Sequence, residues 1–204
     1  MSATIAEKEI AMTAVKILFD HGFADAHSAG QDVEKWFRTE NLKDCGFCLC
    51  CGATKAVFMF NGLDNWVIKI NLFDEKQFDW CGREYDVYLS AKDCGLERFF
   101  AEVEPLFSLG RMKFFLQQCV RCDGSVDDEI YETMLEDEAY AGLPEDEVWD
   151  KLDEMDEYDR IAYLYGSDDL LDFLNRHEVN DLHRDNFGYD GTQYILTDYS
   201  GFVE

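Results

Sequence analysis

Three side chains near the C-terminus have the types and the spacing that suit a magnesium site. Asp181 and Asn186 lie five residues apart in a polar segment, and Asp198 follows a stretch, residues 193–196, that is typical of a strand. An Asp-Gly pair before that stretch is typical of a hairpin turn, so the two ends of the segment should fold together. Because Mg²⁺ prefers carboxylates, waters and phosphate oxygens, we expect the three polar side chains to converge on a metal–phosphate group.

A lysine within an early apolar run is the second chemical feature. Residues 46–51, 56–60 and 66–72 are typical of three strands, separated by turn-forming residues. Strand alternation divides the third run into two faces. These faces are Trp66, Ile68, Ile70 and Leu72 on one side, and Val67, Lys69 and Asn71 on the other. Lys69 is then either a phosphate ligand or an exposed lysine on a half-buried strand.

The order of these motifs resembles that of the protein-kinase-like superfamily. Val-Ile-Lys at 67–69 is similar to the end of the family's Val-Ala-Ile-Lys strand. Asp-Leu-His-x-x-Asn at 181–186 is similar to the catalytic loop of atypical or small-molecule kinases, and Asp-Tyr-Ser-Gly at 198–201 resembles the Asp-Phe-Gly metal motif. The resemblance covers roughly residues 45–202 and implies a minimal or truncated atypical member that ends just after the metal motif.

This resemblance implies an α+β protein with a two-lobed, protein-kinase-like fold. An antiparallel sheet would form the N-lobe over residues 41–120, and a reduced, mainly helical C-lobe would follow over residues 121–204. Residues 1–40 would be a helical N-terminal extension, and residues 1–204 together a single kinase-like domain.

The resemblance also implies how the N-lobe binds the phosphates. Lys69 would contact the α- and β-phosphates, and Glu84 would hold the lysine ammonium group. Glu84 would lie in the first turn of a helix that is expected over residues 82–92, where acidic residues are favoured in any case. Asp86 is the second candidate for this partner.

Two further stretches would contact the nucleotide. The turn that begins at Gly52 has small residues whose N–H groups can approach phosphate, and Lys55 could add positive charge there. Backbone groups at Cys119 and Val120, near the end of a strand expected over residues 112–120, would hydrogen-bond the adenine.

The resemblance gives the chemical steps to the C-terminal motifs. Asp181 would accept the proton of the attacking hydroxyl, and Asn186 and Asp198 would hold Mg²⁺ on ATP. His183 is expected to anchor this loop by a hydrogen bond. The implied function is an ATP- and Mg-dependent phosphotransferase that moves the γ-phosphate to a hydroxyl acceptor. The alternative is an inactive, nucleotide-binding pseudokinase or an acidic interaction module.

Helical periodicity marks much of the remaining chain. The first two of these helices should pack against the sheet. The predicted helices are residues 4–20; a second from Ser28 through Val33, Trp36 and Phe37; one from Ile130 to Tyr140; one from Val148 to Tyr158; and a last one from Leu170 to Leu174, capped by Ser167 or Asp168 and ending near His177.

Length and charge limit the classes of partner. The chain has 204 residues and a net charge of −26. Such a charge repels nucleic acid and anionic membranes and makes a basic protein or substrate more plausible. The chain has no apolar run of about 18 residues, as a membrane span would need, and its start lacks a signal-peptide core, so a cytoplasmic protein is expected. Nothing in the sequence indicates the oligomeric state.

The eight cysteines leave a zinc site open as a further alternative. In a reducing compartment they are free thiols or metal ligands rather than a disulfide framework. Cys45 and Cys48 form one Cys-x-x-Cys pair, and Cys119 and Cys122 form another. Four thiolates would make a closed structural zinc site. Small buried apolar residues are the other interpretation.

Overall fold

The computed structural model describes residues 2–72, 78–122 and 124–200 of the chain. Within these ranges the protein is α+β, with a five-stranded antiparallel sheet, a two-stranded sheet and eight α-helices. This confirms the α+β class and the antiparallel sheet that the sequence predicts. In the same ranges, no helix combines the length and the apolar character that a membrane crossing requires.

The chain divides into two compact units. The first contains residues 1–89 and 101–119, and the second contains residues 90–100 and 120–204. Helix α4 (Trp80–Asp93) contributes residues to both units.

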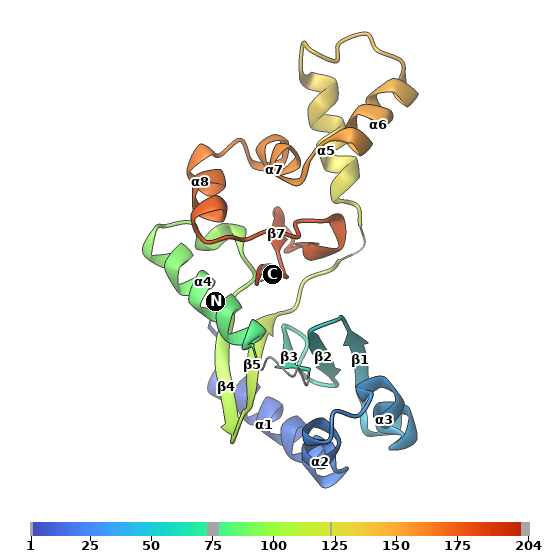
Figure 1. Ribbon diagram of the computed structural model, residues 1–204, viewed down its shortest axis with the longest axis vertical. Helices are drawn as coiled ribbons and strands as arrows, with labels where there is room; N and C mark the ends of the chain where they lie inside the picture. Colours follow the sequence, from blue (N-terminus) through green and yellow to red (C-terminus); the bar gives the residue numbers. More distant parts are fainter. Residues whose placement is uncertain (1, 73–77, 123, 201–204) are drawn as a thin grey trace. The chain divides into compact units, whose positions relative to one another are not determined.

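The first unit is built on the five-stranded sheet. Its strands follow one another in the order β1-β2-β3-β5-β4, and each neighbouring pair is antiparallel (Figure 1). The strands are β1 (Phe47–Cys51), β2 (Lys55–Phe60), β3 (Trp66–Asn71), β4 (Val103–Leu109) and β5 (Met112–Gln118). The first three agree with the predicted strands to within one residue at each end, whereas β5 ends two residues before the predicted limit.

Helices α1 (Ile5–Asp20), α2 (Phe23–Ser28) and α3 (Val33–Thr39) pack against this sheet. The first helix confirms the prediction and begins with a capping box, in which the Thr4 hydroxyl accepts a hydrogen bond from the Glu7 N–H. Their buried side chains join those of the sheet in one hydrophobic cluster, so the N-terminal helices belong to the core of the first unit.

The prediction of a helix that begins at Ser28 is wrong. Ser28 ends α2, and Gly30 follows with a φ of 64°, a conformation that glycine adopts without strain. The next helix begins after Asp32, whose carboxylate accepts a hydrogen bond from the Lys35 N–H at 3.0 Å. Apolar periodicity runs through this break and therefore does not reveal it.

Aromatic side chains fill the space between these helices and the sheet. Phe23 of α2 contacts Phe58 of β2 and Trp36 of α3, with ring centroids 5.7 and 4.9 Å apart. Phe19 of α1 contacts Phe114 of β5 at 5.6 Å. The same cluster contains the predicted apolar face of β3, namely Trp66, Ile68 and Ile70, with Leu72 packed against it. The apolar residues of β3 thus lie on one face of the strand, as strand alternation predicts.

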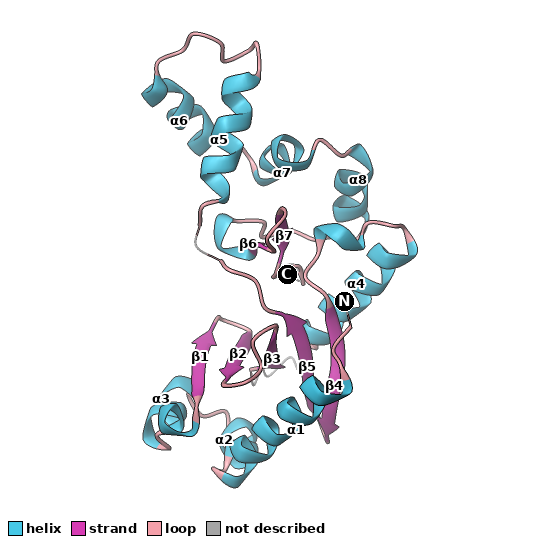
Figure 2. Cartoon of the chain, turned by 180° about the vertical axis from the view of Figure 1, so that it is seen from behind, coloured by secondary structure: helices cyan, strands magenta, loops and turns pink. Residues whose placement is uncertain are grey.

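The second unit combines helices α5 to α8 with a short hairpin (Figure 2). Its elements are α5 (Val126–Glu136), α6 (Glu145–Glu154), α7 (Glu157–Tyr165), α8 (Asp168–Arg176), β6 (Phe187–Tyr189) and β7 (Tyr194–Leu196). The ring of Phe100 lies 5.6 Å from that of Phe173 in α8 and 5.1 Å from that of Tyr199. These edge-to-face contacts bind the segment after the hairpin to the helices.

Two helix limits in the acid-rich region differ from the prediction. Tyr140 lies in a turn beyond the end of α5 rather than in the helix. Tyr158 belongs to α7, because α6 stops at Glu154 and the Asp156 carboxylate caps a new helix by accepting a hydrogen bond from the Asp159 N–H at 2.8 Å. The predicted cap of the last helix is confirmed, since the Ser167 hydroxyl accepts a hydrogen bond from the Leu170 N–H.

Candidate functional site

Strand pairing places two lysines on the same face of the sheet. In the β2–β3 register, Lys55 lies opposite Asn71, and Val57 lies opposite Lys69. Lys55 and Lys69 are therefore diagonal neighbours across one strand pair, close enough for long side chains to meet. This face is opposite to the one that α1 to α3 cover.

Helix α4 supplies the carboxylate that joins them. The Lys69 ammonium donates to both oxygens of Glu84, at 2.8 and 3.0 Å, and the Lys55 ammonium donates to Glu84 Oε1 at 2.8 Å. The exposed fractions of the three residues are 3%, 5% and 0% for Lys69, Lys55 and Glu84. The ion pair that the resemblance implied is therefore present, and the alternative of an exposed Lys69 is wrong. Burial limits the competition from water and salt that weakens surface ion pairs.

Two expectations about these residues need correction. Glu84 lies in the second turn of α4 rather than the first, because the helix begins at Trp80. Lys55 was expected to add charge at the turn after β1, but its side chain reaches Glu84 instead. The Gly52 N–H donates to the Lys55 carbonyl at 3.0 Å, so this N–H is already engaged within the turn.

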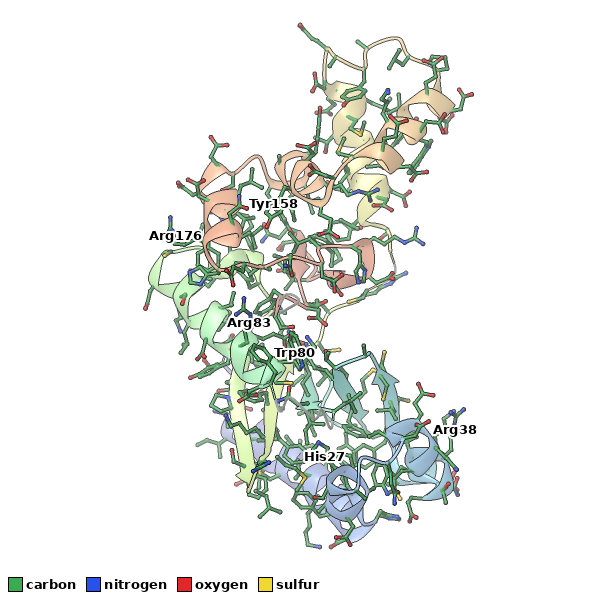
Figure 3. The ribbon with its side chains drawn as sticks, in the orientation of Figure 1. His27, Arg38, Trp80, Arg83, Tyr158 and Arg176 are labelled. Carbon is green, nitrogen blue, oxygen red and sulfur yellow. The ribbon has the colours of Figure 1, made fainter. Side chains whose placement is uncertain are left out.

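A hydrogen-bond network fixes the start of the helix that carries Glu84 (Figure 3 labels its residues Trp80 and Arg83). Asp79 Oδ1 accepts from the Gly82 N–H at 2.9 Å and from the Asn71 side-chain amide at 2.8 Å. The carbonyl oxygen of that same amide accepts from the Cys81 N–H at 2.8 Å. The end of β3 and the first turn of α4 are thus bonded to each other directly.

The charge of Asp79 contributes to this network. Partial burial acts to raise the pKa of the Asp79 carboxyl, but hydrogen bonds from Lys113 and Asn71 and from the Gly82 N–H favour the carboxylate and hold the pKa below its ordinary value. Burial raises the pKa of the neighbouring Cys81 thiol, which therefore stays uncharged beside the buried ion pairs.

Asp79→Asn is expected to lower the free energy of unfolding by about 1 kcal/mol at neutral pH. A carboxyl with a lowered folded-state pKa stabilises the protein fully above its unfolded pKa of about 3.9, and this contribution is lost as the pH falls through the folded-state value. The difference between wild type and variant should therefore shrink as the pH falls below the unfolded pKa. Denaturant titrations from pH 7 to pH 3 measure it; a difference that stays constant over this range would contradict the argument.

Two backbone groups of the residues expected to bind adenine form hydrogen bonds within the protein. The Cys119 N–H donates to the Asn65 carbonyl at 2.8 Å, so this donor is engaged within the first unit and does not meet the expectation. The Val120 carbonyl accepts a long hydrogen bond from the Cys122 thiol at 3.8 Å.

The C-terminal motif forms a tight loop in the second unit. Asp181 has a φ of 65°, and its carbonyl accepts a hydrogen bond of 2.6 Å from the side-chain amide of Asn186. Asn186 is almost fully buried and ends the short 3-10 helix η3 (Arg184–Asn186). His183 caps this turn by accepting a hydrogen bond from the Asp185 N–H at 3.3 Å, which confirms its expected anchoring role.

Helix α7 holds the same loop from outside. The Tyr158 hydroxyl, labelled in Figure 3, donates to the Val179 carbonyl at 3.2 Å. The Glu157 carboxylate accepts from the Leu182 N–H at 2.8 Å. These bonds flank Asp181 on both sides and explain how a loop residue keeps a left-handed backbone conformation.

The hairpin brings the second predicted acid to this loop. Phe187 pairs with Leu196, and one step further the Thr197 N–H donates to the Asn186 carbonyl at 2.8 Å. Asp198 follows directly and accepts a hydrogen bond from the Ser200 hydroxyl at 3.3 Å. Asn186 is therefore bonded on one side to Asp181 and on the other to the residue that precedes Asp198.

The turn of this hairpin is longer than an Asp-Gly pair predicts. Pairing stops at Tyr189 and Tyr194, and the Asp190 carboxylate accepts from the N–H groups of Thr192 and Gln193 at 2.8 and 3.0 Å. The predicted hairpin is confirmed, while its strand begins at Tyr194 rather than at Gln193. Gly191 adopts a φ of 102°, which favours glycine.

The thiols do not form the zinc site considered above. Cys45, Cys48 and Cys119 all lie in the first unit, where Cys48 is exposed and the other two are half-buried. Among the described residues, no three His, Cys, Asp or Glu side chains are grouped so that they could hold a metal ion. Asp198 and Asn186 offer only two protein ligands, one carboxylate and one amide. Mg²⁺ bound by two protein ligands keeps positions for phosphate oxygens and water.

Comparison of the chain with protein-family models, curated proteins and solved structures finds no match. The functional argument therefore depends on the residues themselves. Sequence reasoning named Lys55 but placed its charge at the turn after β1, and it missed the contact with Glu84. The antiparallel β2–β3 register puts residues 55 and 69 on one face.

Proposed function

We propose that this protein is an ATP- and Mg-dependent phosphotransferase with a two-lobed, kinase-like architecture. The observation that carries the proposal is the buried ion pair between Lys69 and Glu84. A lysine that a carboxylate fixes on a buried sheet face is held in one position, and a side chain that binds phosphate needs such a fixed position. In this proposal the first unit is the N-lobe and the second is the C-lobe.

The positive charge of the two lysines supports a phosphate-containing ligand. The chain as a whole carries a net charge of −26, which repels a free nucleoside triphosphate. A nucleotide site in such a protein needs local cations. Two lysine ammonium groups close to one glutamate carboxylate supply them, and Mg²⁺ would neutralise further phosphate charge.

The C-terminal loop would perform the transfer. Asn186 and Asp198 offer the oxygen ligands for Mg²⁺, and Asp181 would accept the proton as the acceptor hydroxyl attacks the γ-phosphorus. A new oxygen–phosphorus bond forms, the bond to the leaving nucleoside diphosphate breaks, and the proton remains on the Asp181 carboxylate. The hydrogen bond from the Asn186 side-chain amide to the Asp181 carbonyl supports this assignment, because it fixes both residues in one loop.

A thermal-shift titration with ATP, with and without Mg²⁺, tests the binding step. At an ATP concentration about 100 times the dissociation constant, wild type should gain about 2.7 kcal/mol of stability. Asp198→Asn should lose the Mg²⁺-dependent part of this gain. Asp185→Asn is the matched control, because its exposed carboxylate lies in the same loop and its removal changes the charge equally. Equal ATP stabilisation of Asp198→Asn and wild type in the presence of Mg²⁺ would contradict the proposal.

Binding of ATP without transfer would favour the pseudokinase alternative. Transfer is therefore measured separately, as labelled phosphate released to water or passed to hydroxyl acceptors, including basic peptides. Basic peptides are the first choice of acceptor because the chain is strongly acidic.

A further inference from the structure

Three side chains at helix ends in the first unit lie in a row through one imidazole ring. The Cys45 Sγ lies 3.7 Å from His21 Nε2, and Glu40 Oε2 lies 3.6 Å from His21 Nδ1. His21 is the C-cap of α1, Glu40 is the C-cap of α3, and Cys45 ends the 3-10 helix η1 (Leu42–Cys45). Thiol, imidazole and carboxylate thus follow one another in the order of a nucleophile, a base and the group that orients the base.

The two ring nitrogens of His21 have different tasks in this order. A neutral imidazole carries one proton, and a carboxylate beside Nδ1 favours the tautomer that has the proton on that nitrogen. Nε2 then offers its lone pair to the thiol proton of Cys45. The imidazolium that forms is stabilised by the Glu40 carboxylate and by the negative end of the α1 dipole. Both effects favour proton transfer from sulfur to the ring.

The row of side chains is open to solvent. The side chains of His21 and Glu40 are 33% and 38% exposed, and Cys45 is half-buried. An ion pair with this exposure contributes little to stability, so folding alone is a weak reason for the arrangement. Cys45 also packs against the hydrophobic cluster of the first unit, which limits its movement beside the ring. A small electrophile can therefore reach a thiol that is held next to a base.

An amide side chain beside Cys45 indicates which electrophile suits the site. Gly46 follows Cys45 with a φ of 88°, and a Cβ at this glycine would stand 2.8 Å from Asn61 Nδ2. The missing side chain thus lets the Asn61 amide lie against the backbone next to the thiol. The Asn61 N–H also donates to the Gly46 carbonyl at 3.0 Å, which holds the two residues together. An amide donor suits the oxygen of a carbonyl group, because this oxygen becomes negative when a nucleophile attacks the carbon.

We propose that Cys45 is a nucleophilic thiol that accepts an acyl group from an activated ester or thioester, with His21 as the base and Glu40 as a positioning residue. His21 removes the thiol proton, and the sulfur forms a bond to the carbonyl carbon. The bond from this carbon to the leaving oxygen or sulfur breaks, and the leaving group takes the proton from His21. The products are S-acylated Cys45 and a free alcohol or thiol. This activity is separate from the proposed nucleotide site, because α1 and α3 cover the opposite face of the sheet from Lys69.

Acetylation by p-nitrophenyl acetate at pH 7 tests the proposal. Release of p-nitrophenolate gives the rate, and peptide mass analysis locates the acetyl group. Cys45 should react about 10²-fold faster than Cys48, the contribution expected of a general base. Cys48 is the internal control, because it lies in the same segment and is more exposed. Access alone would favour Cys48, so a reaction at Cys48 that is as fast as the reaction at Cys45 would overturn the proposal.

His21→Gln removes the base. It should lower the acetylation rate of Cys45 about 10²- to 10⁴-fold and leave the rate of Cys48 unchanged. Cys81 is fully buried, so its labelling reports a variant that has unfolded. An unchanged Cys45 rate in folded His21→Gln protein would overturn the proposal. If His21→Gln labels Cys81, Glu40→Gln decides instead, and an unchanged Cys45 rate in that variant has the same consequence.

Nitrogen-15 NMR of the His21 ring tests the positioning role of Glu40. The neutral ring should carry its proton on Nδ1 in wild type and shift toward the Nε2 tautomer in Glu40→Gln. A purely structural role of Glu40 would leave the tautomer unchanged, and that result would remove Glu40 from the proposal.

Asn61→Ala separates acyl chemistry from general thiol reactivity. It should slow acetylation of Cys45 about 10²-fold, as the loss of one oxyanion donor does. Alkylation of Cys45 by iodoacetamide should keep its wild-type rate, because this reaction forms no oxyanion. Equal acetylation rates of Asn61→Ala and wild type would overturn the choice of an acyl group as the substrate.

Discussion

Asp181→Asn is expected to lower the rate of phosphate transfer about 10²- to 10⁴-fold, with little change in Mg-ATP affinity. The substitution removes the group that would accept the hydroxyl proton but keeps nearly the same shape. Asparagine also tolerates the positive φ of 65° at this position. The bond from the Asn186 amide goes to the backbone carbonyl of residue 181, so it survives the substitution. A loss of rate would thus report on chemistry rather than on folding.

The measurement is single-turnover transfer of labelled γ-phosphate at saturating Mg-ATP. Asp185→Asn serves again as control, since it changes one exposed carboxylate in the same loop and should keep the wild-type rate. Wild-type turnover that is unchanged in Asp181→Asn would reject Asp181 as the base. A wild type that binds Mg-ATP but transfers nothing would assign the protein to the pseudokinase alternative.

Glu84→Gln should be the most destabilising of the substitutions considered for the first unit. It leaves two buried ammonium groups, those of Lys55 and Lys69, without the carboxylate that both contact. Removal of one partner from a buried ion pair typically costs about 3–5 kcal/mol. For a chain of this size, such a loss corresponds to a decrease of about 10 °C in Tm. Denaturant unfolding and calorimetry at pH 7 measure both quantities.

Asp86→Asn is the control for this prediction. Asp86 lies two residues further along α4, is exposed, and was the second candidate for the partner of Lys69. Its substitution removes the same charge from the same helix and should change the free energy of unfolding by less than about 0.5 kcal/mol. If both substitutions lowered the free energy of unfolding equally, the ion pairs of Glu84 would not be the cause of the loss. Nucleotide-free protein is used throughout, so that ligand binding does not mask the difference.

Local patterns in the sequence determined most elements that carry the candidate site. Strand alternation in β3 separated Lys69 from Ile68 and Ile70, because successive side chains of a strand point to opposite faces. The hairpin between Asn186 and Asp198 also followed from its turn-forming residues and the strand-like stretch after them. These features depend on neighbours in the sequence, so period and turn chemistry are enough to predict them.

Tertiary structure alone decided which of these side chains meet and which are covered. Strand alternation showed that Lys69 shares a face with Asn71, but it could not show that α4 buries this face. Nor could it show that the Lys55 ammonium group contacts Glu84 rather than the turn after β1. It also could not show that the Cys119 N–H is bonded to Asn65. The reason is physical: these partners lie far apart in the chain, and only strand register and helix packing bring them within hydrogen-bond distance.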